Sequence, residues 1–62
     1  MKKNNFDTNI KALEKVFYSL FNTKDMKGEA VKISEYDMKY TVLACESIKA
    51  AIEQLNKIHV FN

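Results

Sequence analysis

The longest helical pattern in the chain is residues 34–58, SEYDMKYTVLACESIKAAIEQLNKI. Apolar side chains recur there at steps of three and four residues, which places them on one side of an α-helix. Ser34 is the expected N-cap, because its hydroxyl can accept a hydrogen bond from a free backbone N–H. Asp37, three residues later, resembles a shortened capping box. The pattern predicts a long amphipathic helix that ends at about Ile58.

A shorter amphipathic pattern precedes it. Asp7 or Thr8 is the expected N-cap, and the helix is expected to end near Thr23. Its apolar residues are Phe6, Ile10, Leu13, Val16, Phe17, Leu20 and Phe21. Those from Ile10 to Phe21 fall within an arc of about 140° around the helix.

A connector of about ten residues, 24–33, joins the two helices. Gly28, the only glycine, marks the expected break, because glycine adopts a positive φ without steric cost. Val31 and Ile33 alternate with less apolar neighbours, which favours a short extended segment. A short helix over 26–33 is the competing interpretation.

These elements predict an all-α fold, a two-helix antiparallel hairpin that forms one small domain over residues 1–62. Residues 1–5 are polar and are expected to be a disordered tail. No stretch approaches the roughly 20 apolar residues of a membrane span. A lone cysteine, Cys45, fits a reducing compartment, so the expected location is cytoplasmic.

The hairpin is expected to form a four-helix-bundle homodimer. A chain this short buries only about 60% of its unfolded surface, and small scaffolds need a disulfide, a metal or a partner subunit. If Ser34 began opposite Thr23, the end of the longer helix would project past the start of the shorter one. A second copy would then cover the projecting apolar side chains. The expected oligomer interface is Ile48, Ile52, Leu55, Ile58 and Phe61.

The chain carries no recognisable catalytic, cofactor-binding or metal-binding motif. Cys45 and His59 are 14 residues apart, roughly 21 Å along one helix, so they cannot act as a nucleophile and its base. Glu46 and Glu53, with Lys49 between them, indicate a solvated charged stripe rather than a cleft. Phosphate-binding loops, dinucleotide-binding glycines and nucleophile elbows are absent from the sequence. The chain is therefore expected not to be an enzyme and to need no cofactor.

A candidate partner surface comes from apolar residues on the polar side of the second helix. Val42 lies in the middle of the charged stripe, and Leu43 and Tyr36 form a shoulder beside the main apolar arc. A contact surface and a chance occurrence explain this pattern equally well.

These features favour a non-enzymatic protein–protein interaction module that acts as a regulator, adaptor or inhibitor. One alternative is a weakly basic nucleic-acid-associated regulator, since residues 1–28 hold six lysines against three acidic residues. The chain has no arginine, however, and arginine is the residue suited to bidentate phosphate and base contacts. A second alternative is an accessory subunit of a larger enzyme complex.

Overall fold

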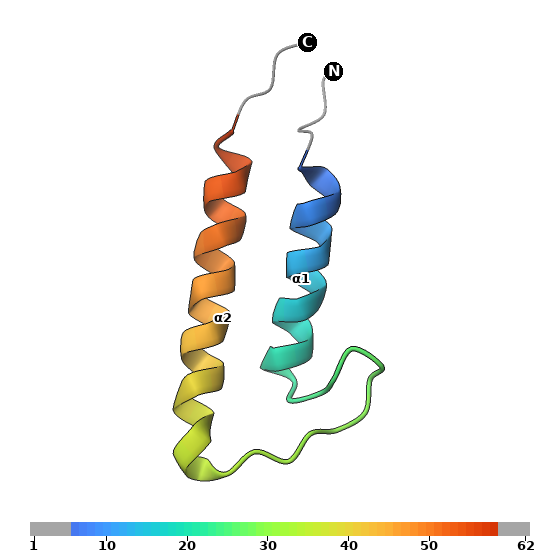
Figure 1. The fold of residues 1–62 in the computed structure, drawn as a ribbon, viewed down its shortest axis with the longest axis vertical. Coiled ribbons are helices and arrows are strands. Elements are labelled where there is room, and N and C mark those ends of the chain that lie inside the picture. Colours follow the sequence, from blue (N-terminus) through green and yellow to red (C-terminus); the bar gives the residue numbers. More distant parts are fainter. Residues whose placement is uncertain (1–5, 59–62) are drawn as a thin grey trace.

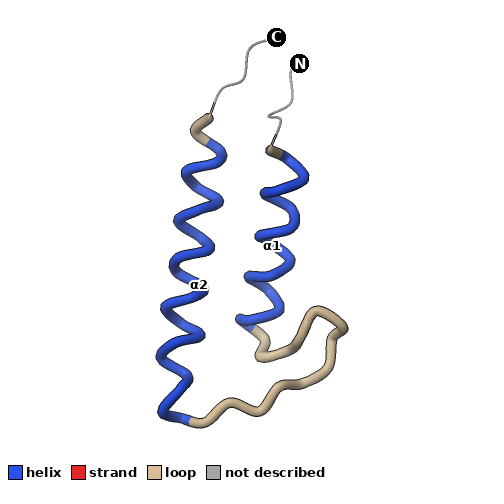
Figure 2. Tube along the Cα trace, in the orientation of Figure 1, coloured by secondary structure: helices blue, strands red, loops and turns tan. Residues whose placement is uncertain are grey.

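The computed structural model describes residues 6–58 and contains two α-helices joined by a long connector (Figure 1). Helix α1 spans Asp7–Phe21 and helix α2 spans Glu35–Asn56. The two helices lie side by side and antiparallel in a single layer (Figure 2). No strand forms within residues 6–58. The predicted all-α hairpin is confirmed.

The start of α2 follows from its capping residue. Ser34 has extended backbone angles, φ −66° and ψ 155°, and its hydroxyl accepts a hydrogen bond of 3.2 Å from the backbone N–H of Asp37. This geometry satisfies one of the N–H groups that the first turn leaves without a helical partner. Ser34 is therefore the N-cap, as predicted. The helix ends at Asn56, two residues before the expected end at Ile58.

The start of α1 differs from the prediction. Neither Asp7 nor Thr8 is the N-cap, because Asp7 is already the first helical residue. Phe6 occupies the capping position and supplies no side-chain hydrogen bond. A carboxylate in the first turn is nevertheless favourable, because the N-terminal end of a helix carries a partial positive charge. The short polar side chain of Asp7 had suggested a cap, but it contributes charge instead.

The end of α1 is closed by hydrogen bonds between Ser19 and Lys24. The backbone N–H of Lys24 donates to the carbonyl of Ser19 at 2.9 Å, and the Ser19 hydroxyl donates to the carbonyl of Lys24. Between them, Thr23 adopts a left-handed backbone conformation with φ 50°. The chain leaves the helix here, and α1 ends at Phe21, two residues before Thr23, near which the end was expected.

The connector contains a tight turn centred on Asp25. Its carboxylate accepts backbone hydrogen bonds from Lys27 and Glu29, both 2.9 Å long. Gly28 has φ +89°, a conformation that favours glycine. The turn brings Lys24 and Ala30 together as an isolated antiparallel bridge. No helix forms over residues 26–33.

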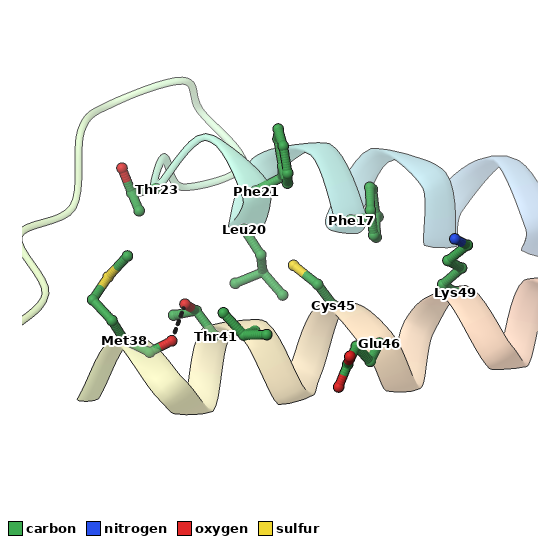
Figure 3. Close-up of a pocket in the computed structure, with 10 residues that line it drawn as sticks. Phe17, Leu20, Phe21, Thr23, Met38, Thr41, Cys45, Glu46 and Lys49 are labelled. Atoms are coloured by element: carbon green, nitrogen blue, oxygen red, sulfur yellow. Dashed lines mark hydrogen bonds between the residues drawn. The ribbon is translucent and has the colours of Figure 1, made fainter. Parts of the chain in front are cut away.

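The connector also decides how the helices are aligned. After the turn, residues 31–34 continue without a helical turn and carry the chain beyond the end of α1 (Figure 1). An extended segment advances about 3.3 Å per residue, more than twice the rise of a helix. Thr23 consequently lies across from Met38 and Thr41, not from Ser34 (Figure 3). The expected alignment is therefore wrong: the first turns of α2 project at the loop end.

The core is small. Ile10, at 7% exposed, is the only buried side chain among residues 6–58. Other apolar side chains of the two helices are only half-buried. They are Leu13, Val16, Phe17, Leu20, Ala44, Cys45, Ile48, Ile52 and Leu55. Stable domains usually pack two layers around a core, and this hairpin supplies only one.

Candidate functional site

A groove lies on one face of the hairpin, between α1 and the loop-proximal half of α2 (Figure 3). Its volume is about 310 Å³. Apolar side chains form its walls, Thr23 and Thr41 lie toward the loop, and Glu46 and Lys49 lie toward the other end. We call the apolar residues the groove face: Phe17, Leu20, Phe21, Met38, Val42 and Cys45.

The groove face follows from helical spacing. Phe17 and Phe21 are one turn apart, and their rings stack with centroids 6.0 Å apart and an interplanar angle of 11°. On α2, Met38, Val42 and Cys45 follow one another at steps of four and three residues, so they form one row. The Thr41 hydroxyl donates to the carbonyl of Met38 at 2.7 Å, so its polar atom is bonded within its own helix.

Large apolar side chains are exposed around the loop end of the hairpin. In the groove face, Phe21 is 68% exposed, Val42 55% and Met38 39%. Of the exposed large apolar residues within 6–58, all except Phe6 and Ile58 lie between residues 18 and 43. Single exposed apolar residues are ordinary, but the number found at this end of the hairpin makes it the candidate interaction site.

The sequence pattern did not reveal this exposure. Phe17 and Phe21 belong to the apolar set of the first helix, which places them on its apolar side but does not say what covers that side. In the structure both line the groove. No local feature of the sequence distinguishes an apolar residue that faces a partner helix from one that faces an open groove.

The three residues of the predicted partner surface do not lie on one face. Val42 lines the groove, whereas Tyr36 and Leu43 do not. Tyr36 and Leu43 are seven residues apart, so they share one side of α2, about 100° or more around the helix from Val42. Tyr40 lies near them, and the Lys39 ammonium is 4.5 Å from the Tyr36 ring centroid and 5.1 Å from that of Tyr40. We call Tyr36, Tyr40 and Leu43 the tyrosine ridge.

Three residues of the predicted oligomer interface lie in the C-terminal half of α2. Ile48, Ile52 and Leu55 are half-buried, and Ile58 is 41% exposed. Phe61 lies outside the described residues. Ile52 also lines a smaller hollow of about 170 Å³, which shares Phe17 and Lys49 with the groove. The role of these residues in an interface stays a prediction.

The lysine-rich half of the chain forms a shallow surface on α1. Lys11 and Lys15 lie one turn apart and, with Thr8 and Ala12, line an open hollow of about 440 Å³. Lysine ammonium groups attract phosphate as point charges, without the bidentate geometry of arginine. This surface is the candidate site for the nucleic-acid alternative.

Among the described residues, no cluster of side chains is suited to bind a metal ion. No three His, Cys, Asp or Glu side chains within 6–58 are placed to hold a metal ion. Cys45 is a free, half-buried thiol in the groove face, and His59 lies outside the described residues. Within 6–58, neither helix combines the length and apolar character that a bilayer crossing requires.

Comparisons with known protein families, with curated proteins and with solved structures find no match to this chain. Its function must therefore be inferred from its own surfaces. Among the described residues, these are the groove face, the tyrosine ridge and the lysine surface on α1. The first two consist mainly of apolar and aromatic side chains, which are typical of protein contacts.

Proposed function

We propose that this chain is a non-enzymatic interaction module. Two hairpins pair into a four-helix-bundle homodimer, and the dimer binds another protein as a regulator, adaptor or inhibitor. The observation that carries the proposal is the concentration of exposed large apolar side chains between residues 18 and 43. Exposed side chains of this kind favour contact with another protein, because burying them removes apolar surface from water.

The homodimer is supported by the small core. Ile10 is the single buried residue within 6–58, which gives the isolated hairpin little hydrophobic stabilisation. In a homodimer, a second copy of the chain supplies the second layer of helices that the single hairpin lacks. Mass action then requires the melting temperature to rise with protein concentration. Sedimentation that shows a folded 7.2 kDa monomer at tens of micromolar would contradict the homodimer.

Binding of another protein is supported by the tyrosine ridge. Tyr36 is 71% exposed, Tyr40 52% and Leu43 54%, on a side of α2 separate from the groove. Tyrosine is enriched at protein interfaces because its ring buries a large apolar area and its hydroxyl still finds a hydrogen bond. A dimer that buries the groove face leaves this ridge accessible to a partner.

Site-specific photocrosslinking in native host cells tests this binding. A photoreactive amino acid at position 36 should give a discrete adduct with one protein, whereas the same group at Lys15 should not. The Lys15 position controls for non-specific capture, because it is also exposed but lies on the lysine surface of α1. If the captured protein proves to be an enzyme that loses activity without this chain, the accessory-subunit alternative applies.

A titration with duplex DNA and with RNA tests the nucleic-acid alternative. Lysine contacts to phosphate release counterions, so specific binding would persist at near-physiological salt and fall steeply as salt rises. The interaction module should bind neither nucleic acid above the generic non-specific level. Tight, salt-dependent binding that Lys11→Ala and Lys15→Ala weaken would replace the proposed function by this alternative.

A further inference from the structure

We infer that the tyrosine ridge binds a protein segment that carries a carboxylate among apolar side chains. This inference rests on the proposed binding of another protein at the ridge, and it names the chemistry of that partner. Tyr36, Tyr40 and Leu43 supply the apolar part of the surface, and Lys39 supplies its charge. The place of the Lys39 ammonium group indicates which charge the partner must bring.

The ammonium group of Lys39 lies against both tyrosines of the ridge. Its Nζ atom is 4.5 Å from the ring centroid of Tyr36 and 5.1 Å from that of Tyr40. Both distances fall within the roughly 6 Å over which an aromatic face attracts a cation. Lys39 follows Tyr36 by three residues and directly precedes Tyr40, so helical spacing permits both contacts. The ridge therefore presents one positive charge beside two aromatic rings.

This charge has no counter-ion among the described residues. No carboxylate within 6–58 forms an ion pair with Lys39. Glu35 precedes it by four residues, a spacing at which glutamate and lysine often pair on a helix. The ammonium group lies over the tyrosine rings instead. The ridge thus carries a net positive charge that a partner can compensate.

A partner that covers the ridge has to replace the water around this charge. Lys39 is exposed, and Tyr36 beside it is 71% exposed, so solvent reaches the ammonium group in the free chain. A protein surface laid over the rings removes that solvent. An ammonium group that loses its water without gaining an anion is strongly disfavoured. A carboxylate at this place on the partner compensates the loss, and apolar neighbours cover the rings.

Two other occupants match the ridge less well. In a two-fold contact between ridges of two copies, the same surface meets itself, so two Lys39 ammonium groups approach each other. None of Tyr36, Tyr40 and Leu43 supplies a carboxylate to separate them. A nucleic acid is usually bound by several clustered basic side chains, whereas the ridge offers one. Charge complementarity therefore favours an acidic and apolar segment of another protein.

Selection from a library of random peptides displayed on phage tests this chemistry. Peptides that bind the full chain but not its Tyr36→Ala variant should be enriched in aspartate or glutamate next to apolar residues. The same selection on Lys39→Glu should instead enrich lysine or arginine. Lys57→Glu is the matched control, because Lys57 is exposed on the same side of α2 about five turns later. Selection on this control should retain the acidic preference.

A double-mutant cycle with one selected peptide measures the contact itself. Lys39→Gln should raise the peptide dissociation constant at least about tenfold, the size expected for a hydrogen bond to a charged group. Replacing the acidic residue of the peptide by its amide should have a similar effect. The two changes combined should cost little more than either alone, because both remove the same contact. Isothermal titration gives the four constants, and circular dichroism verifies that each variant keeps its helices.

The outcomes separate this inference from the proposed function. Peptides that require Tyr36 but show no acidic preference, or keep it on Lys39→Glu, would show that the inference is wrong while the ridge still binds protein. If no selected peptide requires Tyr36, the ridge is not the partner site, and both fail. Binding of duplex DNA or RNA that Tyr36→Ala abolishes would also overturn the inference.

Discussion

Val42 and Leu43 are adjacent in the sequence and almost equally exposed, yet only Val42 lines the groove between the helices. Successive residues of a helix point about 100° apart, so the two side chains belong to different surfaces. Val42 belongs to the groove face and Leu43 to the tyrosine ridge. The groove face and the tyrosine ridge are therefore two separate surfaces of the same helix.

Ile10 should be the most sensitive position in the hairpin. Ile10→Ala should lower the free energy of unfolding by about 2–4 kcal/mol, because it removes the single buried side chain of the described residues and leaves a cavity between the helices. Chemical denaturation followed by circular dichroism measures this change. The neighbouring exposed substitution Lys11→Ala should stay within about 0.5 kcal/mol. Equal effects at the two positions would mean that Ile10 does not pack as the structure shows.

Ser34 should stabilise the start of α2. Ser34→Ala removes the hydroxyl that accepts from the Asp37 backbone N–H, and should lower the free energy of unfolding by about 1 kcal/mol. Amide exchange at Asp37 should become faster. Ser47→Ala, the same substitution inside α2, is the control and should be nearly neutral. A neutral Ser34→Ala would contradict the capping role.

Gly28 should contribute to stability only through its backbone conformation. No atom lies within 4 Å of the position that a Cβ would occupy, so Gly28→Ala meets no steric obstacle. Its φ of +89° is nevertheless unfavourable for alanine, and the substitution should lower the free energy of unfolding by about 1 kcal/mol. Lys27→Ala, in the same turn, should have a smaller effect. Unchanged stability in Gly28→Ala would show that the turn is not held in this conformation in solution.

Cys45 should be protected from alkylation in the native protein. Its thiol is half-buried in the groove face. Labelling should therefore be slow in the native protein and fast in denaturant. Cys45→Ala should cost roughly 1–2 kcal/mol through lost packing. A native labelling rate that equals the denatured rate would show that the thiol is open to solvent.

The two helices could be predicted because the signals that form them are local. The three- and four-residue spacing of apolar side chains identified both helices, and the Ser34 hydroxyl sits three residues before the N–H that it caps. The N-cap of α1 was predicted wrongly because an aspartate is suited both to the capping position and to the first turn of a helix. The local sequence does not decide between these two positions for Asp7.

The alignment of the helices was a property of the tertiary structure. It depends on the turn around Asp25, the Lys24–Ala30 bridge and the stretch of chain that follows, all of which act together across the connector. Several connector conformations are compatible with the same apolar spacing, and each would align the helices differently. Amino-acid order by itself determined which faces of the helices are apolar, because side-chain direction repeats every 3.6 residues. Only the folded connector decided which of those apolar residues meet the opposite helix and which remain in an open groove.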